Sequence, residues 1–184
     1  MQQATNKKNH GQKKIFNVIE ISTLVTIILT IVSHKTSLIP ENTVLDIIAM
    51  ILAMTLSAVY IIMAYLLRAG KLRGILQRDS APISFKNFIF ILMFLSNAII
   101  TTGVLYLIKN YPGGKIMAEM GGFTEAVLLI IFIISMPKYK NQPPFAVKYG
   151  NKSKIITFKN NEIIIRALVL LTLDIIAMFA FTTI

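Results

Sequence analysis

Five long runs of apolar residues, separated by short charged segments, constrain this chain more than any other feature of its sequence. A helix of about 20 apolar residues crosses the roughly 30 Å hydrocarbon core of a bilayer. Apolar residues make up 55% of the 184 residues and charged residues only 15%, whereas soluble domains contain about 25% charged residues. The sequence therefore predicts an all-α integral membrane protein, a single domain over residues 1–184 that forms a bundle of five transmembrane helices. The predicted spans are residues 15–33, 43–67, 87–108, 116–136 and 163–184.

The distribution of basic residues predicts how these spans are oriented, because short cytoplasmic loops collect Lys and Arg. With the N-terminus in the cytoplasm, all but three of the 19 Lys and Arg residues fall in the N-terminal tail, in the connectors 68–86 and 137–162, or just inside the last span. The exceptions are Lys35, Lys109 and Lys115. We therefore expect a multi-pass protein of the bacterial inner (cytoplasmic) membrane with a cytoplasmic N-terminus and cytoplasmic loops at 68–86 and 137–162.

The fourth run is the least apolar, since it contains Glu119, Gly121, Gly122 and Glu125. A protein with only four spans is therefore an alternative. That alternative would move the lysines of the last connector to the outside, against the tendency of basic residues to stay in the cytoplasm. The charge pattern favours five spans over four.

Residue types that carry out most enzyme chemistry are missing from the apolar runs. The chain has no cysteine, and its two histidines, His10 and His34, lie outside the runs. The serine-hydrolase, zinc-protease, P-loop and dinucleotide-binding patterns are absent from the sequence. We therefore expect a protein that is not an enzyme, with no catalytic residue, no metal site and no cofactor.

Polar side chains inside a bilayer are costly, so they tend to face the bundle and to have partners. The positions of Glu20 and Arg166 near the cytoplasmic ends of their spans predict an ion pair between them. Glu125 and Asp174 lie at a similar depth nearer the middle, with Asn97 close to the same level. Two interpretations remain open for these carboxyls: they bind a proton or cation, or each is neutral and hydrogen-bonded to a neighbouring helix.

The second run carries small residues at a spacing that places them on one helix face, Ala49, Ala53 and Ser57. Small residues allow helices to approach closely in lipid, within one chain or between copies. We expect copies of the chain to associate through this face, which predicts a homo-oligomer.

The connector 137–162 predicts a small β-hairpin, with an irregular basic loop as the alternative. Residues 145–149 alternate in polarity, residues 150–153 favour a turn, and residues 154–158 are rich in β-branched types. Basic loops attract anionic lipid headgroups, and aromatic residues among cations are typical of protein interfaces. We therefore expect contact with membrane lipids and docking of a cytosolic protein, and no direct nucleic-acid binding. The predicted docking residues are Arg68, Lys71, Arg73, Arg78, Lys148, Lys152 and Lys154.

The overall plan of the chain, a compact bundle of spans with basic cytoplasmic loops and no enzyme motif, resembles the small membrane subunit of the Kiwa anti-phage defence system. This resemblance is one of architecture, and it transfers no residue roles. It implies a homo-oligomeric subunit that senses phage attack and holds a cytosolic, DNA-binding partner. The leading hypothesis is thus a membrane scaffold or sensor. The alternatives are a small ion or proton transporter or channel that uses Glu125 and Asp174, and an immunity protein against a pore-forming toxin.

Reporter fusions test the predicted topology. Because the basic residues lie almost entirely on one side, fusions after Lys71 and Asn151 should report the cytoplasm, and fusions after Lys35 and Gly114 the periplasm. Paired alkaline phosphatase and fluorescent-protein fusions measure both states. A cytoplasmic signal at Gly114 would exclude the five-span arrangement.

Overall fold

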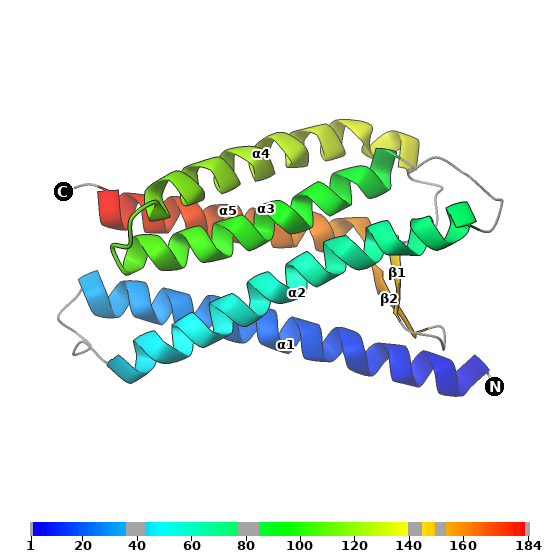
Figure 1. Cartoon of the computed structure of the whole chain (residues 1–184), viewed down its shortest axis with the longest axis horizontal. Helices are drawn as coiled ribbons and strands as arrows, with labels where there is room; N and C mark the ends of the chain where they lie inside the picture. The colour runs from blue at the N-terminus through cyan, green and yellow to red at the C-terminus, as the bar shows by residue number, and fades with distance from the viewer. Residues whose placement is uncertain (1, 36–42, 77–84, 140–144, 150–153, 183–184) are drawn as a thin grey trace.

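The computed structural model describes residues 2–35, 43–76, 85–139, 145–149 and 154–182 (Figure 1). Five helices run along its long axis, with the two termini at opposite ends. The helices are α1 (Gln2–Lys35), α2 (Thr43–Leu76), α3 (Phe85–Ile108), α4 (Gly114–Tyr139) and α5 (Asn160–Thr182), and two strands, β1 (Phe145–Tyr149) and β2 (Lys154–Phe158), precede α5.

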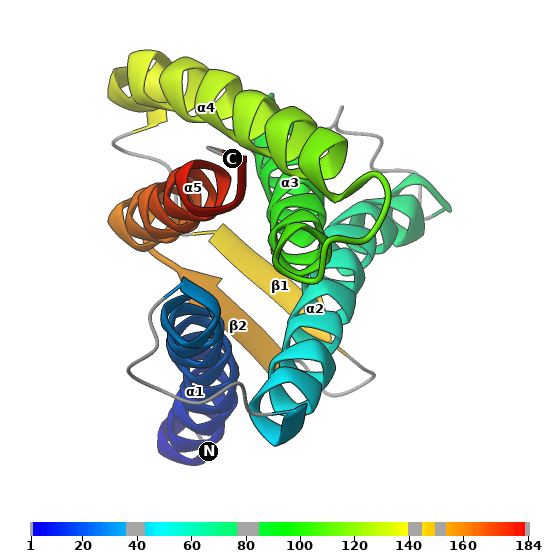
Figure 2. The ribbon, with the colours of Figure 1, turned by 90° about the vertical axis from the view of Figure 1, so that its left-hand side faces the viewer.

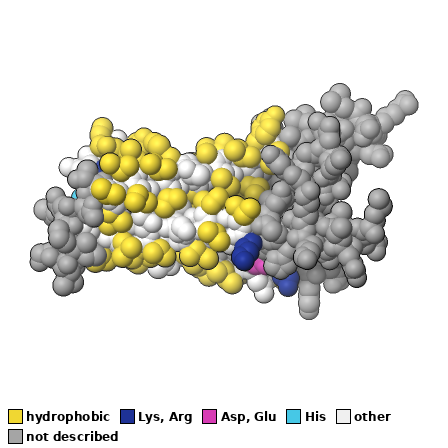
Figure 3. All heavy atoms as spheres, turned by 90° about the horizontal axis from the view of Figure 1, so that it is seen from below, with side chains coloured by type: hydrophobic (Ala, Val, Ile, Leu, Met, Phe, Trp, Pro, Cys, Tyr) yellow, Lys and Arg dark blue, Asp and Glu magenta, His cyan; other side chains and the backbone are white. Residues whose placement is uncertain are grey.

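Each helix contains a stretch long and apolar enough to cross a membrane, so the prediction of five long apolar helices is confirmed, including the fourth. Figure 3 shows hydrophobic side chains along one face, with Lys, Arg and acidic side chains near its right-hand end. The chain therefore has the build of a multi-pass membrane protein. The apolar stretches are Lys14–Lys35, Val44–Leu66, Phe85–Ile108, Gly114–Lys138 and Asn160–Phe181.

Two helices extend well beyond their predicted spans. Helix α1 begins at Gln2 and α2 continues to Leu76, so the first half of the predicted loop 68–86 is helical. The apolar runs mark only the part of a helix that leaves water, and Ala, Leu, Lys and Arg favour helix in water as well. Gly70 and Gly74 lie inside α2, although glycine is a poor helix former.

The two strands lie at the same end of the bundle as these helix extensions. They pair antiparallel, with Phe145 opposite Phe158 and Tyr149 opposite Lys154. Strand β1 contacts α2 and β2 contacts α1, and Figure 2 shows the pair behind the space between α1 and α2. The predicted turn, residues 150–153, lies outside the described residues.

Helix α3 is the centre of the bundle, with 67% of its apolar stretch buried against 33% to 39% for the other four. Glycines bring α4 unusually close to it. A Cβ added to Gly103 would lie 2.6 Å from the backbone nitrogen of Ala118, and one added to Gly114 would lie 2.5 Å from that of Leu107. Glycine therefore allows backbone-to-backbone contact between α3 and α4, as small residues do in membrane proteins.

The small residues of α2 pack inside the chain. Ala49, Ala53 and Ser57 are 1%, 0% and 6% exposed. The Ser57 hydroxyl donates to the carbonyl oxygen of Ala98 in α3 at 3.2 Å. The prediction that copies associate through this face is therefore wrong, because α2 already uses it against its neighbours.

Replacing Ala53 by Leu tests this correction. Extra methyl groups in a closed packing site cost about 1–3 kcal/mol, so Ala53→Leu should lower the thermal unfolding temperature in detergent at every protein concentration. Ala58→Leu is the matched control, since Ala58 is exposed on the same helix, and it should behave like wild type. If Ala53→Leu kept wild-type stability and lost only crosslinked oligomers, the face would be an interface between copies.

Candidate functional site

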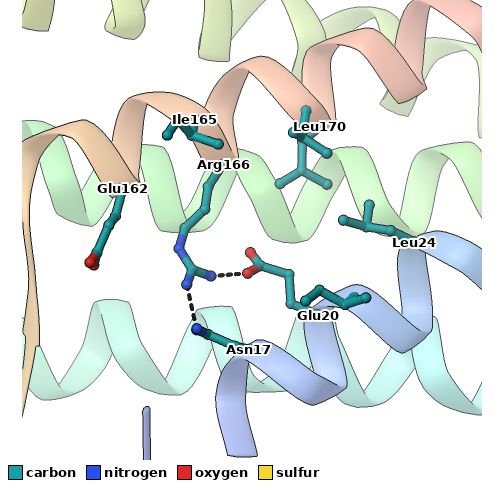
Figure 4. Close-up of a pocket in the computed structure, with 9 residues that line it drawn as sticks. Asn17, Glu20, Leu24, Glu162, Ile165, Arg166 and Leu170 are labelled. Carbon is teal, nitrogen blue, oxygen red and sulfur yellow. Dashed lines mark hydrogen bonds and ion pairs between the residues drawn. The ribbon is translucent and has the colours of Figure 1, made fainter. Parts of the chain in front are cut away.

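A group of four side chains joins α1, α2 and α5 within the apolar stretches. Arg166 of α5 forms an ion pair with Glu20 of α1, and its Nη2 donates to Asn17 Oδ1 at 2.7 Å (Figure 4). The Tyr60 hydroxyl of α2 donates to Glu20 Oε1 at 2.6 Å. We call this group, Asn17, Glu20, Tyr60 and Arg166, the Glu20–Arg166 cluster.

Burial explains why these partners occur together. The charged side chains of Glu20 and Arg166 are only 8% and 11% exposed, and an unpaired charge in such a place is strongly destabilising. The Arg166 guanidinium also lies 4.7 Å from the centre of the Phe16 ring, a favourable cation–π distance. The cluster thus fixes α1, α2 and α5 relative to one another.

The ion pair between Glu20 and Arg166 was predicted from their positions near the same ends of their spans, and the structure contains it. Tyr60, which is fully buried, is a member of the cluster that the sequence did not predict. Its position within an apolar run could have indicated such a contact, because a buried tyrosine hydroxyl usually has a hydrogen-bond partner.

A second set of polar side chains lies in the interior between α3, α4 and α5. Glu125, Asn97 and Asp174 are 0%, 4% and 5% exposed. Within the described part of the chain, neither carboxylate oxygen of Glu125 has a hydrogen-bond partner, nor do Asn97 Oδ1 and Asp174 Oδ1. The predicted interior position of these residues is thus observed, but no hydrogen bond joins Glu125 to Asp174 there.

Asp174 occupies a notch in α4. Its carboxylate packs directly on Gly122, where any side chain would collide with it. The adjacent Gly121 faces the other way, and its carbonyl oxygen accepts a hydrogen bond from Ser96 of α3 at 2.8 Å. Gly121 and Gly122 make the fourth run less apolar. In the structure they allow α4 to pack closely against α3 and α5.

The opposite end of the bundle contains a third polar group, which was not predicted from the sequence. Asp46 at the start of α2 forms an ion pair with Lys109, just past α3, and lies 3.2 Å from His34 Nε2 of α1. In the part of the chain that the structure describes, no three acidic or histidine side chains are placed to hold a metal ion.

Five of the seven predicted docking residues lie on segments that project beyond the apolar stretches. Arg68, Lys71 and Arg73 are on the end of α2, Lys148 is on β1 and Lys154 on β2. Arg78 and Lys152 lie outside the described residues. Because β1 contacts α2 and β2 contacts α1, these segments are gathered at the end nearest the Glu20–Arg166 cluster.

A double-mutant cycle on Glu20 and Arg166 tests the cluster. Removing one partner leaves the other charge buried, so Glu20→Gln and Arg166→Met should each destabilise the protein, whereas the double variant should recover part of the loss. The expected coupling is about 1–3 kcal/mol, measured by unfolding in detergent. The control is Lys115 with Glu119, an exposed pair at 3.9 Å, which should show coupling near zero. Additive losses at Glu20 and Arg166 would contradict the assignment.

Comparison with protein-family models, with curated protein sequences and with solved structures finds no match to this chain. Any function assigned to it has to rest on its own residues and geometry.

Proposed function

We propose that the chain is a non-enzymatic scaffold or sensor subunit of the bacterial inner membrane. Its basic end lies in the cytoplasm and docks an acidic cytosolic protein. The observation that carries this proposal is the gathering of the α1 extension, the α2 extension and the β1–β2 pair at one end of the bundle. We call these three segments the basic platform.

The length of the platform favours a protein partner over lipid headgroups alone. Residues 2–13 extend α1 by about 18 Å beyond its apolar run, and residues 68–76 extend α2 by about 14 Å, at 1.5 Å per residue. A headgroup layer adds only about 5–8 Å on each side of the hydrocarbon core. Much of the platform therefore lies beyond the headgroups, where a cytosolic protein can reach it.

The charge of the platform specifies the chemistry of the partner. Its segments carry Lys7, Lys8 and Lys13 on α1 and the basic residues already named on α2, β1 and β2. The chain as a whole has a net charge of +11. A surface with one sign of charge attracts a partner of the opposite sign and accelerates its association. An acidic protein surface is thus the complement that we propose.

The resemblance in overall plan supplies a biological setting for this proposal, a homo-oligomeric subunit in anti-phage defence. Because the Ala49, Ala53 and Ser57 face is buried within the chain, association of copies would have to use another face. Immunity against a pore-forming toxin is an alternative function for the same membrane bundle. Crosslinking that captures a toxin in place of a cytosolic protein would identify that function.

A proton carrier is the second candidate function, and one observation favours it. Glu125 is fully buried and its carboxylate has no hydrogen-bond partner among the described residues. An ionisable side chain inside a membrane span is uncommon and often belongs to a proton or ion pathway. Glu20, by contrast, is already engaged by Arg166 and Tyr60. Transport would therefore depend on Glu125 and Asp174.

Charge reversal on the platform separates the two candidates. The variant with Lys148→Glu, Lys152→Glu and Lys154→Glu should insert normally but lose its cytosolic partner, because attraction becomes repulsion. Photo-crosslinking from position 149 identifies the bound chain, and position 111, a tyrosine at the opposite end, serves as the control. Reporter fusions verify that topology is unchanged.

Membrane-acid variants provide the opposite test. Asp174→Asn and Glu125→Gln should leave crosslinking to the partner and phage protection largely intact, since neither residue lies on the platform. Proton flux into liposomes measures transport directly. If the two acid variants abolished activity and proton flux while the lysine variant behaved like wild type, the docking proposal would be wrong.

A further inference from the structure

A cavity of about 640 Å³ lies between the C-terminal end of α4 and the N-terminal end of α5. Both helix ends are at the end of the bundle where the β1–β2 pair lies (Figure 1). Binding sites for small ligands have volumes of roughly 300–1,000 Å³, so the cavity is large enough for one. We call it the α4–α5 cavity. Its described lining residues are Ile133, Met136, Pro137, Lys159, Asn160 and Asn161.

The cavity lies where two apolar stretches end, which is the level of the lipid headgroups in a bilayer. The apolar stretch of α4 ends at Lys138, and that of α5 begins at Asn160. The wall that α4 contributes is apolar and continues inward. Ile133 is about 8 Å before Lys138 along the helix axis, at 1.5 Å per residue, and it is 47% exposed. A molecule with a polar headgroup and an acyl chain therefore matches the lining.

The polar side of the cavity offers hydrogen-bond donors and acceptors. Asn160 Oδ1 is buried and accepts no hydrogen bond within the described part of the chain. A buried acceptor without a partner is costly, so a donor from a bound molecule would stabilise this end of α5. Lys159 has an exposed side chain, and its backbone N–H donates to Glu162. Glu162 lines the pocket on the α1 side of α5 (Figure 4) and is not among the lining residues of the α4–α5 cavity.

The charge of the lining selects one headgroup chemistry. Among the described lining residues, Lys159 is charged and none is acidic. A second cation, Lys138, directly follows the lining residue Pro137. A phosphate is attracted by these ammonium groups, whereas the ammonium of an ethanolamine headgroup would be repelled by them. Hydroxyl groups both donate and accept hydrogen bonds, as the side-chain amides of Asn160 and Asn161 do. A headgroup with one phosphate and neutral hydroxyls therefore complements the lining.

We propose that the α4–α5 cavity binds one anionic phospholipid of the phosphatidylglycerol type. Its phosphate lies at Lys159, its glycerol hydroxyls lie at Asn160 and Asn161, and an acyl chain lies along Ile133. The proposal requires the five helices to lie in a membrane and does not rest on the docking function. Basic segments attract anionic lipid in general. A built site differs from that attraction because it retains a single lipid and loses it when one lining residue is changed.

Native mass spectrometry of the full chain tests the proposal, after reconstitution in vesicles of equal palmitoyl-oleoyl phosphatidylglycerol and phosphatidylethanolamine and extraction in mild detergent. Wild type should retain one phosphatidylglycerol about fivefold over phosphatidylethanolamine. That ratio corresponds to about 1 kcal/mol, the contribution of one lysine at a membrane surface. Lys159→Gln should abolish the preference. Lys14→Gln is the matched control, because Lys14 is also exposed and begins the apolar stretch of α1 at the same end of the bundle. It should retain lipid as wild type does.

The acyl-chain contact has its own variant. Ile133→Trp places a large ring on the apolar wall and should lower retention of phosphatidylglycerol. Ile130→Trp is its control, since Ile130 is exposed on the same helix and does not line the cavity. Both lining residues, Lys159 and Ile133, are exposed, so their variants should fold.

Three results would overturn the proposal. The first is equal or stronger retention of phosphatidylethanolamine by wild type, and the second is unchanged retention of phosphatidylglycerol in either lining variant. The third is equal loss in Lys14→Gln and Lys159→Gln, which would show general attraction only. Calorimetric binding of glycerol 1-phosphate to the lipid-free chain, with no lipid retained by wild type, would assign the cavity to a soluble phosphate ester instead.

Discussion

The pairing of Glu20 with Arg166 is the interaction on which the arrangement of α1 depends. Helix α1 packs mainly on α2 and makes fewer contacts with α5 and α3, so its contact with the rest of the helix bundle is limited. A carboxylate left alone in this position would cost several kcal/mol. Because Arg166 comes from α5 and the Tyr60 hydroxyl from α2, satisfying one charge sets the rotation and height of α1 against two other helices. The Asp46 group does the same at the opposite end, where Lys109 and His34 hold α1, α2 and α3 together.

Helices α3 and α4 are held by a different principle. Their contact depends on missing side chains, since Gly103, Gly114 and Gly121 bring backbone against backbone. Lipid tails are as apolar as leucine, so helices in a bilayer gain little from burying apolar surface and depend on close packing and hydrogen bonds. The bundle thus combines a tightly packed pair, α3 and α4, with a more peripheral helix, α1, that charged contacts position.

The sequence was sufficient to predict the five apolar helices and the ion pair of Glu20 with Arg166, because hydrophobic length and depth are properties of single helices. It was insufficient wherever the answer depended on rotation about a helix axis. Ala49, Ala53 and Ser57 share a face in any helix, but only the packing shows that the face points into the bundle. The same limit hid the contact of Tyr60 with Glu20 and the fit of Asp174 against Gly122. The extensions of α1 and α2 were not predicted for another reason. Hydropathy identifies the apolar part of a helix, and a helix can continue into a polar segment.

The continuity of α1 connects the membrane part of the chain to the platform. It is a single helix from Gln2 to Lys35, so the segment that contacts β2 and the segment that carries Glu20 belong to one rigid element. Arg166, six residues into α5, stands only a short distance along the chain from β2, which ends at Phe158. The ion pair therefore joins α1, which contacts β2, to α5, which follows β2 in the chain, near the platform end of their apolar stretches. A platform built on flexible tails would have to be ordered by a partner at an entropic cost. The segments of the basic platform instead continue from, or contact, helices that the ion pair already fixes relative to one another, so binding of the proposed partner would not carry that cost.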